Sequence, residues 1–249
     1  MQSLCVHFLP ALMPAESLAG GTAVIIDILR ASSTITTALL NGAGCVIPCG
    51  SPDEARNIRD ASPMNSVLLG GERGGVLIKG FDCGNSPMEY PSSRVSGKTI
   101  VFTTTNGTKA LLKSAAAETI LIGAFLNRQV LVERLHADPR AVHLVCAGTD
   151  GEVTGEDVLF AGAVVESLLA LQNGRWNLND CAIIARAFWQ QSAGAESDQP
   201  LSSRIESAMR QTHGGRNLIG LGYDNDIQLC SAVDSIAVVP MLRGNALTK

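Results

Sequence analysis

Short apolar runs rich in β-branched residues alternate along most of this chain with stretches whose apolar residues recur at helical spacing. Strands that alternate with helices indicate an α/β protein, and strands that are apolar on both faces are typical of a sheet covered on both sides. We therefore predict a three-layer α/β/α fold with a largely parallel or mixed sheet. The strand-like runs cover residues 22–28, 45–48, 67–69, 98–103, 119–122, 142–146 and 236–239.

The stretches between these runs carry helix signals. Residues 51–54 form a capping box that starts one helix, and Asn106 is placed to cap another that ends near residue 112. Further helices are predicted over residues 32–41, 126–135, 156–171 and 178–191, and the small, polar residues 192–199 are interpreted as a surface loop. No Pro-, Gly- or Ser-rich linker divides the chain, so we expect a single unit over residues 1–249. Similar β-turn-α layouts that begin at residues 25, 100 and 144 are compatible with two related lobes.

Composition excludes several classes of protein. The chain has 19 Lys and Arg against 23 Asp and Glu, a formal net charge of −4, which argues against a nucleic-acid partner. No apolar run reaches the ~18 residues of a membrane helix. The N-terminus has no signal-peptide pattern, so we expect a cytoplasmic protein without a membrane partner. The seven cysteines form no C-x-x-C pair, which indicates reduced thiols rather than a zinc or redox site. Association into a homo-oligomer stays open.

Polar residues follow the apolar runs at the points where ligands bind in open α/β sheets. Asp27 interrupts the first run and is followed by Arg30 and Ser32 at a predicted helix start. A buried charge needs a partner. One interpretation is an internal Asp27–Arg30 ion pair, and the other is a metal ligand beside an anion-binding helix start.

Three later runs end in the same way. The run at residues 67–69 is followed by GGERGG, in which four glycines surround Glu72 and Arg73. The run at residues 98–103 ends in the hydroxyl-rich TTTNGT string at residues 103–108. Residues 142–146 are followed by Thr149 and then by the acids at 156 and 157. An acid at position 156 is explained by the helix dipole, whereas Asp157 is a candidate site residue because its helix is otherwise nearly free of charge.

These side chains suggest one kind of chemistry. Acids with oxygen-rich neighbours suit a hard cation such as Mg²⁺, whereas arginines and helix N-termini suit phosphate. We therefore expect metal-assisted phosphoryl chemistry at one rim of the sheet, where Asp27, the 72–73 pair and the threonine cluster meet.

Common signatures of other phosphate chemistry are absent from the sequence. There is no P-loop and no G-x-G-x-x-G after the first run. A C-x₅-R phosphatase motif at Cys146 is excluded because Glu152 holds the arginine position. Leu29 stands where haloacid-dehalogenase-type phosphatases have the second Asp of their Asp-x-Asp pair.

Six strings in order resemble the 2-phosphosulfolactate phosphatase family. They are IDILRAS (26–32), GGERGG (70–75), GFDCGNSPMEY (80–90), TTTNGT (103–108), CAGT (146–149) and GEDVLFAGA (155–163). The resemblance runs from about Val24 to Pro240, and Cys83 departs from the aliphatic residue more often found there. It implies an α/β fold and Mg²⁺-dependent hydrolysis of 2-phospho-3-sulfolactate to 3-sulfolactate and phosphate, a step of coenzyme M synthesis.

This resemblance and the residues above together define the expected site for a small polyanionic substrate. Two alternatives stay open, namely a phosphatase for another phosphorylated 2-hydroxy acid and a non-catalytic anion-binding protein. A water molecule activated by the metal is the preferred nucleophile, and a phosphorylated Asp27 is its competitor. We expect catalytic roles for Asp27, Arg30 and Arg73, Mg²⁺ binding by Asp27, Glu72 and Asp157, and substrate binding by Ser32, Asn85, Ser86, Thr104, Thr105, Asn106 and Thr149.

Overall fold

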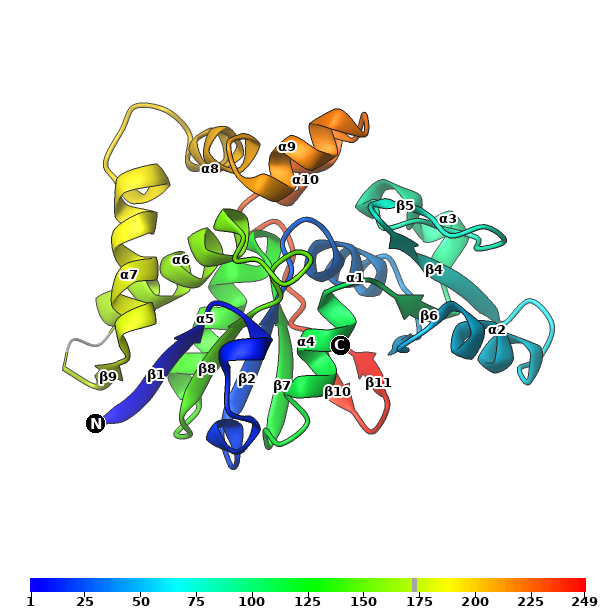
Figure 1. Cartoon of the computed structure of the whole chain (residues 1–249), viewed down its shortest axis with the longest axis horizontal. Helices are drawn as coiled ribbons and strands as arrows, with labels where there is room; N and C mark the ends of the chain where they lie inside the picture. Colours follow the sequence, from blue (N-terminus) through cyan, green and yellow to red (C-terminus); the bar gives the residue numbers. More distant parts are fainter. Residues whose placement is uncertain (172–173) are drawn as a thin grey trace.

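The computed structural model describes residues 1–171 and 174–249 as an α/β fold built on one mixed sheet (Figure 1). Its strands run in the order β5-β4-β6-β3-β11-β10-β7-β2-β8-β1-β9. The strands are β1 (Gln2–His7), β2 (Thr22–Ile26), β3 (Cys45–Pro48), β4 (Val67–Arg73), β5 (Val76–Leu77), β6 (Thr99–Thr103), β7 (Thr119–Gly123), β8 (Val142–Cys146), β9 (Trp176–Leu178), β10 (Met241–Arg243) and β11 (Ala246–Thr248).

The helices confirm most of the expected pattern. They are α1 (Ala31–Leu40), α2 (Pro52–Asp60), α3 (Ser92–Val95), α4 (Gly107–Lys113), α5 (Arg128–Ala137), α6 (Gly155–Leu171), α7 (Asp180–Trp189), α8 (Leu201–Arg210), α9 (His213–Gly220) and α10 (Asp224–Cys230). Short 3₁₀ turns occupy Pro10–Leu12, Ala15–Leu18, Pro87–Glu89 and Phe125–Asn127, and a π-helical turn occupies Gln190–Gly194. As expected, Ser51 caps α2, because its side chain accepts a hydrogen bond from the Glu54 N–H at 3.1 Å.

The sheet contains two groups of parallel strands. One group is β4-β6-β3 and the other is β7-β2-β8-β1-β9, and the C-terminal hairpin β10–β11 lies between them. The pairings β7–β10, β10–β11 and β11–β3 are all antiparallel, so the two groups run in opposite directions along the sheet. Figure 1 shows that the strands of the two groups are inclined to one another.

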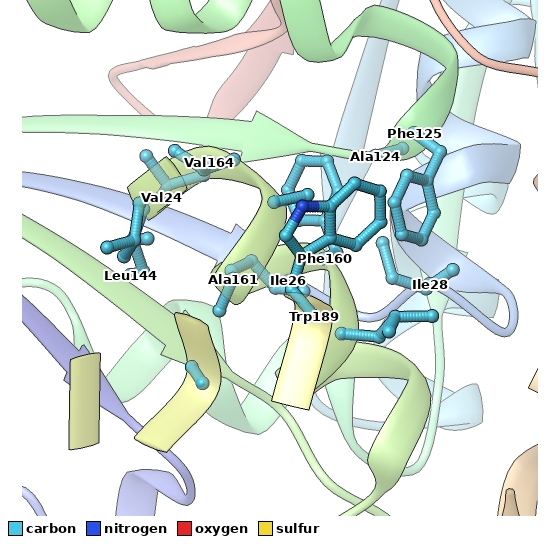
Figure 2. Close-up of a cluster of buried hydrophobic side chains, with 14 of the residues drawn as sticks. Val24, Ile26, Ile28, Ala124, Phe125, Leu144, Phe160, Ala161, Val164 and Trp189 are labelled. Carbon is cyan, nitrogen blue, oxygen red and sulfur yellow. The ribbon is translucent and has the colours of Figure 1, made fainter. Parts of the chain in front are cut away.

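The predicted three layers are present, and β2 shows why. Its side chains alternate between the two faces, as strand geometry requires. Val24 and Ile26 belong to the core shared with α5, α6 and α7, whereas Ala23 and Ile25 belong to the core shared with α1 and α4. Figure 2 shows the first core, in which the Phe125 ring packs against the rings of Phe160 and Trp189. Full burial of each large aliphatic or aromatic side chain stabilises the fold by about 1.5–3 kcal/mol.

Three expectations for local structure need correction. Residues 236–239 pair with no strand; the strands near this end are those of the hairpin that follows Pro240, so the strand expected there was wrong. The first part of the loop expected at 192–199 belongs to the π-helical turn that ends at Gly194. Helices α8, α9 and α10 form a segment for which no element was predicted, and it covers the ends of the β2 group (Figure 1).

Other expectations concern the whole chain. None of the helices in the described residues is long and apolar enough to cross a membrane. All seven cysteines are free thiols, as expected. The interpretation of similar β-turn-α segments as related lobes stays a prediction.

Candidate active site

A small cavity of about 60 Å³ lies where the ends of the two strand groups meet α9. Six of the residues predicted for the site line it, although they come from five separate segments. The lining comprises Asp27, Leu29, Arg30, Glu72, Gly75, Asn85, Asn106, Thr149, Gly214, Asn217 and Leu218. The expected meeting of position 27 with the 72–73 segment and the threonine loop is therefore present, and the roles assigned to these residues stay predictions.

Asp27 follows the last residue of β2 and is held by the start of α1. Its Oδ1 accepts the Ala31 N–H at 3.2 Å, and its own N–H donates to Ser32 Oγ at 2.9 Å. Gly107, the first residue of α4, lies against the carboxyl, since a Cβ there would stand 2.7 Å from Oδ2. Burial raises the pKa of Asp27 to about 7, and the nearby charges of Glu72 and Glu156 add to this effect.

Glu72 lies near the end of β4 and holds two loops in place. Its Oε1 accepts the Thr105 N–H and its Oε2 accepts the Gly75 N–H, each at 2.8 Å. The Thr105 hydroxyl also lies 3.4 Å from Oε2. The side chain is only 7% exposed. The carboxylate therefore joins the threonine loop after β6 to the turn after β4, and Thr105 serves the site through this bond.

Arg30 carries a buried ion pair that the sequence did not indicate. Its Nη1 lies 2.5 Å from Asp226 Oδ2, and the two side chains are 2% and 3% exposed. Its Nη2 donates to the Gly75 carbonyl at 2.9 Å, and the guanidinium lies 4.3 Å from the Tyr223 ring centroid. The alternative of an Asp27–Arg30 pair was wrong, because the partner of Arg30 is 196 residues away in sequence.

Arg73 does not line the cavity, in contrast to Glu72. Neighbouring residues of a strand point to opposite faces of the sheet. The Arg73 guanidinium donates to the Glu72 carbonyl at 2.7 Å and to Thr103 Oγ1 at 2.9 Å. The structure thus places this predicted catalytic residue beside the cavity wall, where it supports the end of β6.

Asp157, in the first turn of α6, joins the ends of β2 and β8. Its Oδ1 accepts the Ile28 N–H at 2.9 Å, and its Oδ2 accepts the Gly148 N–H at 3.1 Å and the Thr154 hydroxyl at 3.3 Å. Burial raises the pKa of Asp157 well above its usual value, with further contributions from Asp27 and Glu156. The carboxylate thus holds the backbone next to two residues that line the cavity, Leu29 and Thr149.

The predicted substrate-binding residues fall into two sets. In the first set, three side chains are already engaged: the Ser32 hydroxyl accepts the Asp27 N–H, Ser86 Oγ donates to Asp226 Oδ1 at 2.6 Å, and Asn106 Oδ1 accepts the Asp150 N–H at 3.3 Å. Asn106 stands at the N-cap position of α4 without a capping side-chain bond, which corrects that expectation.

The other set has unused hydrogen-bonding capacity. Within the described part of the chain, Asn85 Oδ1 and Thr104 Oγ1 are buried and have no hydrogen-bond partner. Asn85 lines the cavity, and Thr104 lines a narrower hollow of about 20 Å³ on the other side of Asp27. Thr149 also lines the cavity. Buried polar atoms without partners are costly unless a ligand or water satisfies them, so these atoms favour a polar occupant.

Sequence reasoning missed three residues of the site. Glu156 was explained by the helix dipole, yet it is only 2% exposed and its charge helps to raise the pKa of Asp27. Its Oε2 is buried and has no hydrogen-bond partner among the described residues. A signal for Glu156 was present in the apolar surroundings of its helix. Asp226 and Asn217 gave no signal, because they lie in a segment for which no element was predicted.

The three carboxylates expected to bind Mg²⁺ are not gathered into a ready ligand cluster. Among residues 1–171 and 174–249, no three His, Cys, Asp or Glu side chains are arranged to hold a metal ion. Both oxygens of Glu72 and of Asp157 already accept backbone N–H groups, and Asp27 Oδ1 accepts the Ala31 N–H. Of the three carboxylates, Asp27 and Glu72 line the cavity. Mg²⁺ in phosphate-processing sites commonly binds one or two carboxylates together with water and substrate oxygens, a donor set that this cavity can supply.

Comparisons with known proteins show which family the sequence resembles. A family model described as 2-phosphosulpholactate phosphatase matches residues 7–245. Proteins named "Probable 2-phosphosulfolactate phosphatase" are similar over most of the chain. The one from Symbiobacterium thermophilum is 39% identical (92% of this chain, 94% of that protein), that from Caldanaerobacter subterraneus 39% (88% and 87%), and that from Thermotoga petrophila 41% (92% and 92%). The match to the family model includes every residue that lines the cavity.

Proposed function

Because the chain belongs to the 2-phosphosulfolactate phosphatase family and is thus a phosphoric monoester hydrolase, we propose that it hydrolyses 2-phospho-3-sulfolactate to 3-sulfolactate and phosphate with Mg²⁺. In this reaction the ester P–O bond breaks, the phosphorus gains an oxygen from water, and the 2-oxygen of the product gains a proton. The seven free thiols support a reducing, cytoplasmic location for the reaction.

The charge of the cavity wall is the observation that carries the requirement for a cation. Among the described residues that line the cavity, Arg30 is the sole cation, and its charge is balanced by Asp226. Asp27 and Glu72 line the same wall. A substrate with phosphate, carboxylate and sulfonate groups would therefore meet a wall of its own sign. A bound divalent cation would reverse that sign locally.

Asp27 is the residue best suited to hold Mg²⁺. Burial, with the nearby charges of Glu72 and Glu156, raises its pKa, and a metal ion would stabilise its ionised form. Glu72, the second expected ligand, lines the same cavity and would add negative charge, whereas Asp157, the third, does not line the cavity and would act through the backbone N–H groups that it holds. When bound, Mg²⁺ would neutralise phosphate charge and polarise the reacting P–O bond.

Neutral donors of the cavity would hold the rest of the substrate. The amide groups of Asn85, Asn106 and Asn217 and the hydroxyl of Thr149 line the wall, and each can donate to a carboxylate or sulfonate oxygen. The tight hydrogen bonding of Glu72 and Asp157 supports a rigid arrangement of these loops. Such preorganisation favours alignment of the phosphate with an attacking group.

Water is the nucleophile that we propose, and phosphorylation of Asp27 is the alternative. Mass spectrometry after rapid acid quench separates the two. A phosphorylated peptide that contains residue 27 would overturn direct attack by water, and its absence during steady turnover would support it.

Phosphate release by the purified protein tests the function. We expect release from 2-phospho-3-sulfolactate with Mg²⁺, and loss of that release with EDTA that excess Mg²⁺ restores. Phospholactate and 2-phosphoglycerate, which lack the sulfonate, should be much poorer substrates. Equal turnover of these compounds would favour a broader 2-hydroxy-acid phosphatase. Binding of sulfolactate and Mg²⁺ without any phosphate release would favour an anion-binding protein.

A further inference from the structure

Asp226 of α10 joins parts of the site that are far apart in the sequence. Its Oδ2 accepts from Arg30 Nη1 at 2.5 Å, and its Oδ1 accepts from Ser86 Oγ at 2.6 Å. Both carboxylate oxygens thus bind residues of the cavity region, one between β2 and α1 and the other just before the Pro87–Glu89 turn. The Asp226 side chain is 3% exposed, so these bonds form away from bulk water.

Arg30 extends this connection to a third segment. Its Nη2 donates to the Gly75 carbonyl in the turn after β4, and its guanidinium lies against the Tyr223 ring just before α10. Charge-assisted bonds of this kind are stronger than neutral ones, particularly where water is excluded. The Arg30–Asp226 pair is therefore the main polar link between α10 and the turns that surround the cavity.

Helices α8, α9 and α10 form a cap over the cavity. Figure 1 shows them above the strand ends, and α9 contributes Gly214, Asn217 and Leu218 to the cavity wall. The cap segment, residues 201–230, begins after a polar stretch, Glu196–Gln199, that is exposed to solvent. Apolar side chains of this segment, Ile205, Met209, Leu218, Ile227 and Cys230, are buried in the main core, and Asp226 adds its polar contacts with the cavity region.

We propose that Asp226 is a positioning residue of this enzyme. By binding Arg30 and Ser86, it seats residues 201–230 over the cavity and keeps Asn217 in the cavity wall. This inference rests on the proposed function for its effect on catalysis, whereas the seating of the cap can be measured without any substrate.

Asp226→Asn is the main test, because asparagine has the same shape. Its oxygen can still accept from Arg30, while its amide meets the Ser86 hydroxyl, so the link is weakened without a cavity. If the cap is seated in a smaller fraction of molecules, the apparent affinity falls by that fraction. We expect KM for 2-phospho-3-sulfolactate to rise by about tenfold, with a change in kcat of less than about threefold.

Hydrogen exchange measured by mass spectrometry supplies a reading that requires no turnover. In the ligand-free protein, Asp226→Asn should raise exchange in residues 201–230 and in the 84–87 segment, and leave the β2 and β8 strands unchanged. In the wild-type protein, 3-sulfolactate with Mg²⁺ should slow exchange in α9, and the variant should show less slowing.

Two further variants complete the test. Ser86→Ala removes one bond to Asp226 and keeps the ion pair, so it should produce the same changes to a smaller degree. Glu166→Gln is the matched control: Glu166 forms an ion pair of the same 2.5 Å length with Arg186, between α6 and α7 and apart from the cavity-lining residues. It should leave both KM and the exchange of the cap unchanged.

Several results would overturn the proposal. Wild-type KM together with wild-type exchange in residues 201–230 for Asp226→Asn would do so, and so would a uniform rise in exchange across the whole protein. If Asp226→Asn does not fold, Ser86→Ala decides by the same two readings. If the wild-type protein does not act on 2-phospho-3-sulfolactate, the proposed function fails, and exchange in the ligand-free variants still decides whether Asp226 seats the cap.

Discussion

Replacement of Asp27 by asparagine separates the role of this residue in the site from its effect on stability. A carboxyl with a pKa raised to about 7 is harder to ionise in the folded protein than in the unfolded chain. Asparagine has nearly the same shape and does not ionise. The variant therefore removes a charge that the metal-free fold accommodates poorly, together with the group that we propose to hold Mg²⁺.

The size of the effect follows from the pKa. The ordinary value is 3.8 and the folded value is about 7, and each pKa unit corresponds to about 1.4 kcal/mol, so the cost of ionised Asp27 reaches at most about 4 kcal/mol. Because the folded pKa is raised, the wild type does not bear this cost below about pH 4, where the carboxyl is protonated in both the folded and the unfolded state. The cost grows, and the wild type loses stability, as the pH rises through about 7. Asp27→Asn gains stability because it does not bear this cost. Its side chain binds the adjacent helix start more weakly than the carboxylate does, which offsets about 1 kcal/mol of that gain.

We therefore expect metal-free Asp27→Asn to be more stable than the metal-free wild type by about 2–3 kcal/mol at about pH 8. The difference should shrink toward about pH 4. Urea unfolding in EDTA, followed by circular dichroism at several pH values, measures this difference. Added Mg²⁺ should raise the unfolding midpoint of the wild type and leave that of the variant unchanged, and phosphate release should be lost in the variant.

Two results would refute this reasoning. One is a variant that is less stable than the metal-free wild type at about pH 8, since it would mean that the Asp27 charge is already well accommodated. The other is a variant that keeps its Mg²⁺-dependent rise in midpoint and its turnover, which would remove Asp27 from the metal site.

Three further predictions concern stability and are checked by urea unfolding in EDTA. Asp157→Asn leaves one of two buried backbone N–H groups without its acceptor, at a cost of about 1–3 kcal/mol, and also removes a charge whose pKa burial raises; the stability of the variant relative to the wild type should therefore be lowest near about pH 4 and rise toward about pH 8, and a difference that does not change with pH would contradict that role. Gly71→Ala should lose about 3 kcal/mol or more, since Gly71 has φ of 136° and a Cβ would lie 1.9 Å from the Thr103 carbonyl oxygen. Burial, with the nearby His143, lowers the pKa of His7 to about 4, so the wild type loses stability as the pH falls from about 6.5 to 4. His7→Phe should recover about 1–2 kcal/mol of that loss relative to the wild type at about pH 4, after allowance for partial exposure.

Much of the fold followed from local patterns. The runs that became β2, β3, β6, β7 and β8 are apolar on both faces, and such runs have few alternatives to a covered sheet. Strand β1 was missed, and the strand expected at 236–239 was wrong, because an apolar stretch does not reveal whether a neighbouring strand has an edge free to pair with it. The three helices within residues 201–230 were not predicted.

The sequence predicted which residues stand at the candidate site better than it predicted how their side chains are oriented and paired. Asp27, Glu72 and Thr149 were expected at the site because they follow apolar runs at the points where ligands bind in open α/β sheets, and Asn85 was expected from the family resemblance; all four line the cavity. Arg73 was expected in the cavity, yet strand alternation turns it away from the wall that Glu72 lines. Its direction depends on which face of the sheet the cavity occupies, and no local signal carries that information.

The sequence by itself determined the class of fold, the residues at the strand ends and the family, since each is written in short strings whose meaning depends on near neighbours. Only the tertiary structure decided that two strand groups of opposite direction bring their ends to one cavity, that α9 closes it, and that Arg30 pairs with Asp226. The physical reason is that a buried charge is satisfied by whichever partner packing brings within about 3 Å. For Arg30 that partner is 196 residues away, beyond the reach of any local pattern.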